Sequence, residues 1–161
     1  CGKGMGGGIA LSGVIGKKII MDLPETGNMS STNSANPIAC SAGLAVLDEI
    51  QSKKLIKTTK TKGKILFKEL KKIMKLFPGI INSINGEGLI AAIVFNETKK
   101  KNIDLILKKL AEKCMSDGLL IVYTGRESIK IGPPLTITTS ALNEGIQILK
   151  KNIKLIFKNT K

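Results

Sequence analysis

The chain contains long stretches in which apolar residues recur every three or four positions, the spacing that places them on one face of a helix. Between Leu55 and Leu76 lysines fill the intervening positions, which predicts an amphipathic helix with its lysines turned outward. A second helix is expected from Asn102 to Asp117, with Gly118 as its terminator. A third is expected to be capped by Thr138 or Thr139 and to run to about Phe157.

Shorter apolar runs between these helices predict strands. Residues Ile80–Ile84 and Leu89–Phe95 flank Asn85-Gly86-Glu87-Gly88 and have the pattern of a hairpin or a bulged strand. Two more strands, Leu119–Tyr123 and Ile129–Ile131, are expected with a turn between them. Because strands and helices alternate, the chain is predicted to be of the α/β class, with a small α+β domain as its second part.

The first part of the chain has a different pattern. After a run of glycines, Ile9–Ile15 reads as a short buried strand, and Glu25–Asn36 is a polar segment expected to be a functional loop. Asn36-Pro37 then opens a helix, with a capping side chain and a proline at the first helical position. From Ile38 to Ile50 this helix is so apolar that we expect it to be buried against a sheet or a second subunit. The composition becomes lysine-rich near Ser52, which marks a domain boundary.

Composition narrows the chemistry. A chain of 161 residues with 42% apolar residues can bury a core, and no apolar run approaches the roughly 20 residues that span a bilayer. Its three cysteines are widely separated and it has no histidine, so neither a disulfide framework nor a zinc site is expected. The absence of histidine also excludes Ser-His and Cys-His nucleophile systems, which leaves lysine as the plausible nucleophile. This cysteine usage fits a reducing cytoplasm.

The formal charge of +14 is compatible with a polyanionic partner, because a basic surface releases counterions from nucleic acid. Nearly all of the cations are lysines spread along the predicted helices, and Arg126 is the only arginine. Aromatic residues that stack on bases are scarce. We interpret the lysines as the solvated faces of these helices. The alternative interpretation is that the chain is a basic, non-catalytic module that binds nucleic acid or another polyanion.

One lysine has a different setting. Lys3 lies in the run Gly2-Lys3-Gly4-Met5-Gly6-Gly7-Gly8, where the open backbone lets a planar ligand approach its amine closely. With Leu11–Gly16 behind it, this run is the first of three blocks that occur in order along the chain. The second is Ser31–Pro37 with the helix that follows, and the third is Ile129–Thr138. Together the three blocks resemble the class III aminotransferases, enzymes of fold type I that use pyridoxal phosphate.

The resemblance implies roles for three residues. Lys3 falls on the lysine that forms the Schiff base with the cofactor and shuttles the proton, so it would be both catalytic and cofactor-binding. Thr32, five residues before Pro37, falls on the threonine that binds the cofactor phosphate of the neighbouring subunit, which implies a homodimer. Lys130 stands where many relatives have an arginine that grips a substrate carboxylate, and lysine lacks the planar fork that makes two bonds.

The resemblance also implies an organisation. Residues 1–52 would be the carboxyl-terminal end of the large cofactor-binding domain and would consist of a strand, a loop and a buried helix. Residues 53–161 would form the small α+β C-terminal domain. Because the family's phosphate turn and pyridinium-pairing aspartate precede the Schiff-base lysine, the chain is expected to be a fragment that is inactive alone. The full-length parent is expected to transfer an amino group between an amine or amino acid and a 2-oxo acid. A mutase or decarboxylase on the same scaffold is the nearest variant.

Overall fold

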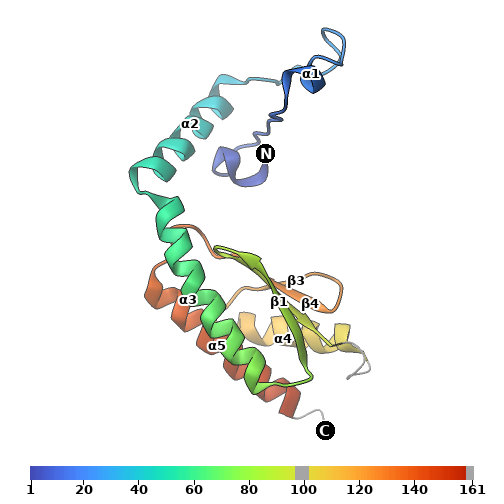
Figure 1. Cartoon of the computed structure of the whole chain (residues 1–161), viewed down its shortest axis with the longest axis vertical. Coiled ribbons are helices and arrows are strands. Elements are labelled where there is room, and N and C mark those ends of the chain that lie inside the picture. The colour runs from blue at the N-terminus through green and yellow to red at the C-terminus, as the bar shows by residue number, and fades with distance from the viewer. Residues whose placement is uncertain (97–101, 159–161) are drawn as a thin grey trace. The chain divides into compact units, whose positions relative to one another are not determined.

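The computed structural model describes residues 1–96 and 102–158, and the chain forms two compact units, Cys1–Leu55 and Ile56–Lys161. The larger unit contains the sheet, whose strands are β1 (Ile81–Glu87), β2 (Ile90–Phe95), β3 (Val122–Tyr123) and β4 (Ser128–Ile131). All pairs are antiparallel, in the order β1-β2-β4-β3. The helices of this unit are α3 (Leu55–Leu76), α4 (Ile103–Ser116) and α5 (Thr139–Lys158), and α3 begins at the boundary between the units (Figure 1).

The sheet has one face in the core and one face half-exposed. Along β2 the side chains of Ala91, Ile93 and Phe95 are buried and alternate with more exposed neighbours, the period of two that a strand covered on one side requires. All three helices contribute to this core, and the ring of Phe95 stacks on that of Phe157 in α5 at 5.5 Å between centroids. The apolar helix residues buried with the sheet are Leu66, Leu70, Ile73, Leu107, Leu110, Leu142, Leu149 and Ile153.

The periodic segments of this unit form as predicted. The helix expected from Leu55 to Leu76 has these bounds, and the expected hairpin is present with β1 paired to β2. Gly118 ends α4 with a φ of 92°, in the left-handed region that favours glycine. At α5 the Thr138 hydroxyl accepts a hydrogen bond from the backbone amide of Ala141 at 3.1 Å, which identifies the cap. The strand predicted for residues 119–123 is shorter, since only β3 pairs with β4.

Helix α3 lies directly on the hairpin turn. Gly63 in this helix is buried, and a Cβ atom built on it would lie 2.4 Å from the carbonyl oxygen of Gly88. Gly88 itself has a φ of 60°, which an L side chain rarely adopts. The approach of helix to turn therefore depends on glycine at both positions.

The smaller unit contains η1 (Lys3–Gly6), the short α1 (Lys18–Met21) and α2 (Pro37–Ser52). The Asn36 side-chain oxygen accepts a hydrogen bond from the backbone amide of Ile38 at 2.9 Å, so the predicted cap and the proline behind it begin α2. Helix α2 packs through glycine on η1 and on the segment that follows it: a Cβ on Gly43 would lie 2.6 Å from Leu11 Cδ2 and 3.7 Å from the carbonyl oxygen of Met5.

One prediction for this unit is wrong, and another stays a prediction. Residues 9–15 were expected to form a buried strand, but the structure shows only an isolated bridge between Gly7 and Ile9, and Ile15 is 92% exposed. A strand needs a neighbour for its backbone groups, and the residues that the structure describes supply none for this segment. The apolar helix forms as α2. Ile38 and Leu44 are exposed, since within the described residues only the η1 side of α2 is covered, and burial of this helix against a sheet or a second subunit stays a prediction.

Candidate functional site

Lys3 lies on a closed, glycine-rich turn. The backbone amide of Gly13 donates to the carbonyl oxygen of Cys1 at 2.9 Å, so the segment that carries Lys3 returns on itself. Lys3 has a φ of 53°, a left-handed conformation that costs a non-glycine residue about 1 kcal/mol or more. Gly7, with a φ of 60°, ends the turn beside Val46 of α2. Backbone strain at a lysine between glycines is typical of a residue held for a purpose other than stability.

The turn and the polar loop form one hollow. Lys3 and Ser12 line a hollow of about 560 Å³, and further lining residues come from the loop before α2. The loop residues that line it are Ser31, Asn33, Ser34, Ala35 and Asn36. The structure therefore brings Lys3 and the hydroxyl-rich segment to a common hollow within the smaller unit.

Hydrogen bonds within the loop shape this wall. The Ser31 backbone amide donates to the Ser34 hydroxyl oxygen at 3.1 Å, and the two hydroxyls lie 3.0 Å apart. Asn36, at the end of the loop, is held by its cap on α2. The loop conformation is thus tied to the first turn of the helix, and the helix in turn packs on the Lys3 turn.

Thr32 lies between two residues that line the hollow but is not itself one of them. Its residue is exposed, and within the described part of the chain its hydroxyl makes no hydrogen bond. The hydroxyl is consequently available to a group outside the unit that holds Lys3.

Lys130 belongs to the larger unit. It lies on β4 opposite Ala92 and Val122, on the half-exposed face of the sheet, and is exposed. It also borders a hollow of about 380 Å³, and among the described residues it is the one charged residue on a wall formed by apolar, glycine and proline residues such as Leu66 and Pro133. A single cation beside apolar surface suits a ligand with one carboxylate and an apolar remainder.

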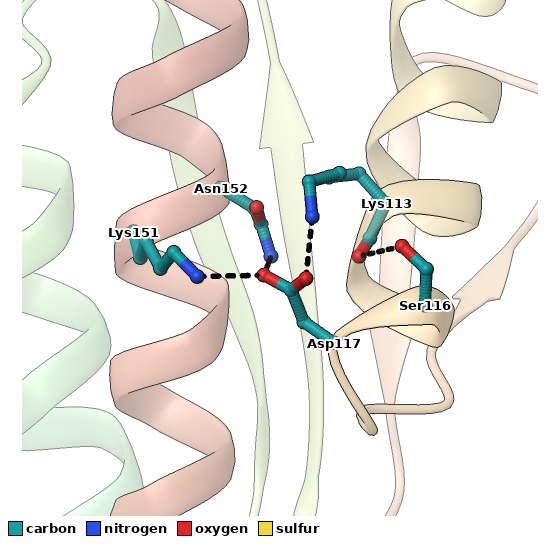
Figure 2. Close-up of polar contacts among 5 residues, drawn as sticks. All are labelled: Lys113, Ser116, Asp117, Lys151 and Asn152. Atoms are coloured by element: carbon teal, nitrogen blue, oxygen red, sulfur yellow. Dashed lines mark hydrogen bonds and ion pairs between the residues drawn. The ribbon is translucent and has the colours of Figure 1, made fainter.

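A polar cluster in the larger unit, in which Asn152 is buried and Asp117 is half-buried, was not predicted from the sequence. The Asp117 carboxylate, at the end of α4, accepts hydrogen bonds from Lys151 Nζ at 3.0 Å and Asn152 Nδ2 at 3.1 Å on α5, and pairs with Lys113 (Figure 2). The hydrogen bonds from Lys113, Lys151 and Asn152 hold the pKa of this carboxyl well below its usual range. Burial raises the pKa of the neighbouring Cys114 thiol to about 11. The signal in the sequence was an asparagine within an apolar helix stripe.

The described residues contain no group of His, Cys, Asp and Glu side chains that could hold a metal ion. None of the helices in residues 1–96 and 102–158 is long and apolar enough to cross a membrane. The residues that line the hollow around Lys3 combine an amine nucleophile with hydroxyl and amide groups.

Comparison with known proteins agrees with this chemistry. The family model for class-III aminotransferases matches residues 1–153. The chain belongs to the class-III aminotransferase family. The predicted family and the α/β class are confirmed, since this family and its solved structures account for nearly the whole chain.

Individual class-III relatives are similar along nearly all of the chain. It is 37% identical over 157 residues to an acetylornithine aminotransferase of Prochlorococcus marinus, which covers 96% of this chain and 35% of that protein. It is 34% identical over 155 residues to a leucine/methionine racemase of Thermococcus litoralis, with 94% and 34% covered. The crystal structure of an acetylornithine aminotransferase from Elizabethkingia anophelis superposes with a TM-score of 0.72 at 31% identity, covering 83% of this chain and 32% of that one. The chain spans about a third of the length of the curated relatives it matches.

Proposed function

We propose that the full-length protein containing this chain is an aminotransferase dependent on pyridoxal 5'-phosphate, and that Lys3 is the residue that holds the cofactor. One observation carries the proposal: Lys3, on a strained glycine-rich turn, lines the same hollow as the hydroxyl-rich loop. Enzymes of the class-III family use this cofactor, which has an aldehyde and a phosphate. An amine and a set of hydroxyl and amide donors are the groups that bind these two functions.

The residues of the hollow fit part of the cofactor. Lys3 would supply the amine for the aldehyde, and Ser31, Asn33 and Ser34, which line the same hollow, would supply polar donors. No carboxylate lines the hollow among the described residues, so this wall does not provide the group that pairs with the ring nitrogen. When bound, the cofactor supplies an electron sink for the carbanion formed at the substrate carbon.

Each of the three residues then has one task. The Lys3 amine would hold the cofactor through its aldehyde and, with an amino substrate bound, would carry a proton on Nζ to and from the substrate carbon. The Thr32 hydroxyl, which has no hydrogen bond in the described part of the chain, donates to the phosphate held by the neighbouring subunit of a homodimer. Lys130 binds a substrate carboxylate as a point charge, with less directional preference than a guanidinium.

The proposal includes the organisation of the parent protein. Residues 1–52 belong to its cofactor-binding domain and residues 53–161 form its small domain. We place the protein in the cytoplasm, a location supported by cysteines Cys1, Cys40 and Cys114, which are all free thiols.

The substrates proposed are an amino acid or amine donor and a 2-oxo acid acceptor. Similarity to acetylornithine aminotransferases supports an amino-acid donor, and similarity to the leucine/methionine racemase supports racemisation as a second candidate. Both reactions begin by removing the proton from the substrate carbon, so Lys3 has the same task in each. Formation of a new amino acid from a 2-oxo acid favours the transaminase, whereas formation of the D-enantiomer without an acceptor favours the racemase.

The test is covalent trapping in the full-length protein. Borohydride is added in the presence of the cofactor, and peptide mass spectrometry locates the lysine that carries it. We expect the label on Lys3, loss of the label and of the bound cofactor's absorbance in Lys3→Ala, and no change in Lys17→Ala, an exposed lysine of the same unit. Labelling of another lysine with full transamination by Lys3→Ala would overturn the assignment.

A further inference from the structure

Helix α3 carries a continuous stripe of lysines on its outer face. Successive residues turn by about 100° around a helix, and within a sector about 120° wide every position between 57 and 75 is lysine except Thr61. We call these residues the lysine stripe: Lys57, Lys60, Lys64, Lys68, Lys71, Lys72 and Lys75. All of them are exposed. The sequence indicated outward lysines, and the structure adds that they share one narrow face.

The stripe is held in place by the opposite face of the same helix. Leu66, Leu70 and Ile73 are at most 1% exposed and lie in the core of the larger unit. The helix cannot rotate without exposing them, so the cations face away from the core. At a rise of 1.5 Å per residue the stripe extends for about 27 Å.

Its charge is almost uncompensated. Among the residues that the structure describes, Lys72 is the only member of the stripe in an ion pair, with Glu69 at 2.6 Å on the flank of the helix. Like charges three and four positions apart repel each other and destabilise an isolated helix by a few tenths of a kcal/mol per pair. Such an arrangement is stabilised by a partner that carries a regular row of negative charge.

We propose that the lysine stripe is a docking surface for the phosphate backbone of a nucleic-acid duplex, bound without sequence preference. Charge complementarity supports this partner: the stripe presents a cation about every 4 Å, and a duplex presents a phosphate charge about every 1.7 Å of its axis. The surface is independent of Lys3 and of the proposed reaction.

Other anionic partners fit the stripe less well. Phe67 and Phe77, the aromatic residues nearest to it in the sequence, are packed against the core, so bases of a single strand have no ring to stack on. Leu66, Leu70 and Ile73 in the middle of α3 are already buried in the core, so they are not free to insert into the interface of an anionic membrane. The stripe also lacks the apolar anchor residue on which protein interfaces depend.

The test measures binding of the 161-residue chain to a fluorescent duplex of about 20 base pairs, long enough to cover the stripe, by anisotropy over a range of KCl concentrations. One variant replaces Lys64, Lys68, Lys71 and Lys75 with Gln. The control variant replaces Lys108, Lys109, Lys150 and Lys154 with Gln, which removes the same net charge from exposed positions of α4 and α5. Circular dichroism verifies that the variants fold.

Each phosphate contact contributes about 0.9 to the slope of log K against log salt, or roughly eightfold in affinity at 0.1 M salt. We therefore expect the stripe variant to lose at least about 100-fold at 0.1 M KCl and to show a slope shallower by about 3. The control should retain most of its affinity. In the unmodified chain, the duplex should also slow acetylation of the stripe lysines more than that of Lys108 and Lys109.

Three outcomes overturn the proposal. Equal loss by both variants would mean that net charge alone attracts the duplex. Single strands or anionic vesicles that bind as tightly as the duplex would identify another partner. Uniform acetylation in the presence of the duplex would place the contact elsewhere, and this measurement needs no variant.

Discussion

Replacing Gly63 with Ala tests the contact between α3 and the hairpin turn. Two effects oppose each other: alanine favours a helix over glycine by about 1 kcal/mol, whereas forcing an extra carbon into a packed site costs about 1–3 kcal/mol. At Gly63 the added Cβ would lie 2.4 Å from the Gly88 oxygen and 2.7 Å from its carbonyl carbon and Cα. These are backbone atoms that cannot rotate away, so the upper end of the cost applies. We expect a net destabilisation of about 2 kcal/mol.

The assay is urea unfolding followed by tyrosine fluorescence. Tyr123 is the only tyrosine, the chain has no tryptophan, and this residue packs against the core of the larger unit, so the signal reports that unit alone. With a slope of about 2 kcal/mol per molar urea, the midpoint should fall by about 1 M.

Gly145→Ala is the matched control. It also adds a carbon to a helix of the same unit, but its nearest neighbour is the flexible end of the Leu119 side chain at 3.1 Å. We expect this variant to be unchanged or stabilised by up to about 1 kcal/mol. If Gly63→Ala is as stable as Gly145→Ala, the close approach of α3 to the turn is wrong.

Three further predictions concern the α4–α5 region. The pKa of Asp117 is lowered in the folded state, so the stability that this carboxylate contributes is complete above the pKa of an unfolded aspartate and is lost as the pH falls below that value. The difference in unfolding free energy between wild type and Asp117→Asn should therefore shrink from pH 5 to pH 3. A constant difference would contradict this. Cys114 is buried, and the pKa of its thiol is raised to about 11. This thiol should therefore resist iodoacetamide at pH 8 in the native state and react after unfolding. Equal rates in both states would refute its burial. Thr138→Ala should cost about 1 kcal/mol in urea unfolding through loss of the cap, while Thr139→Ala, one position further on, should cost nothing; equal effects would argue against the cap.

The candidate site was predictable in part. Lys3 and Thr32 could be selected because the residues around them resemble a known family, and the polar loop could be recognised from its composition. That Lys3 shares a hollow with Ser31 and Ser34 could not be read from residues about 30 positions apart, because the hollow depends on how α2 packs against the turn. The roles of Lys3, Thr32 and Lys130 stay predictions.

Local pattern alone determined the elements whose signals are complete within a few turns of chain. The helix Leu55–Leu76 follows from its own periodicity, the hairpin from two alternating runs about a glycine turn, and the start of α2 from Asn36. In each case the hydrogen-bonding partners are near neighbours in the sequence, so a short segment contains all the residues that determine its structure.

Tertiary structure decided everything that depends on distant partners. Residues 9–15 have the composition of a strand but no neighbouring strand among the described residues, and Asp117 is held by Lys151 and Asn152 of a different helix. The lysine stripe is exposed on one face only because the opposite face of α3 lies in a core. The physical reason is that burial and pairing belong to contacts between elements, which the order of residues does not specify by itself.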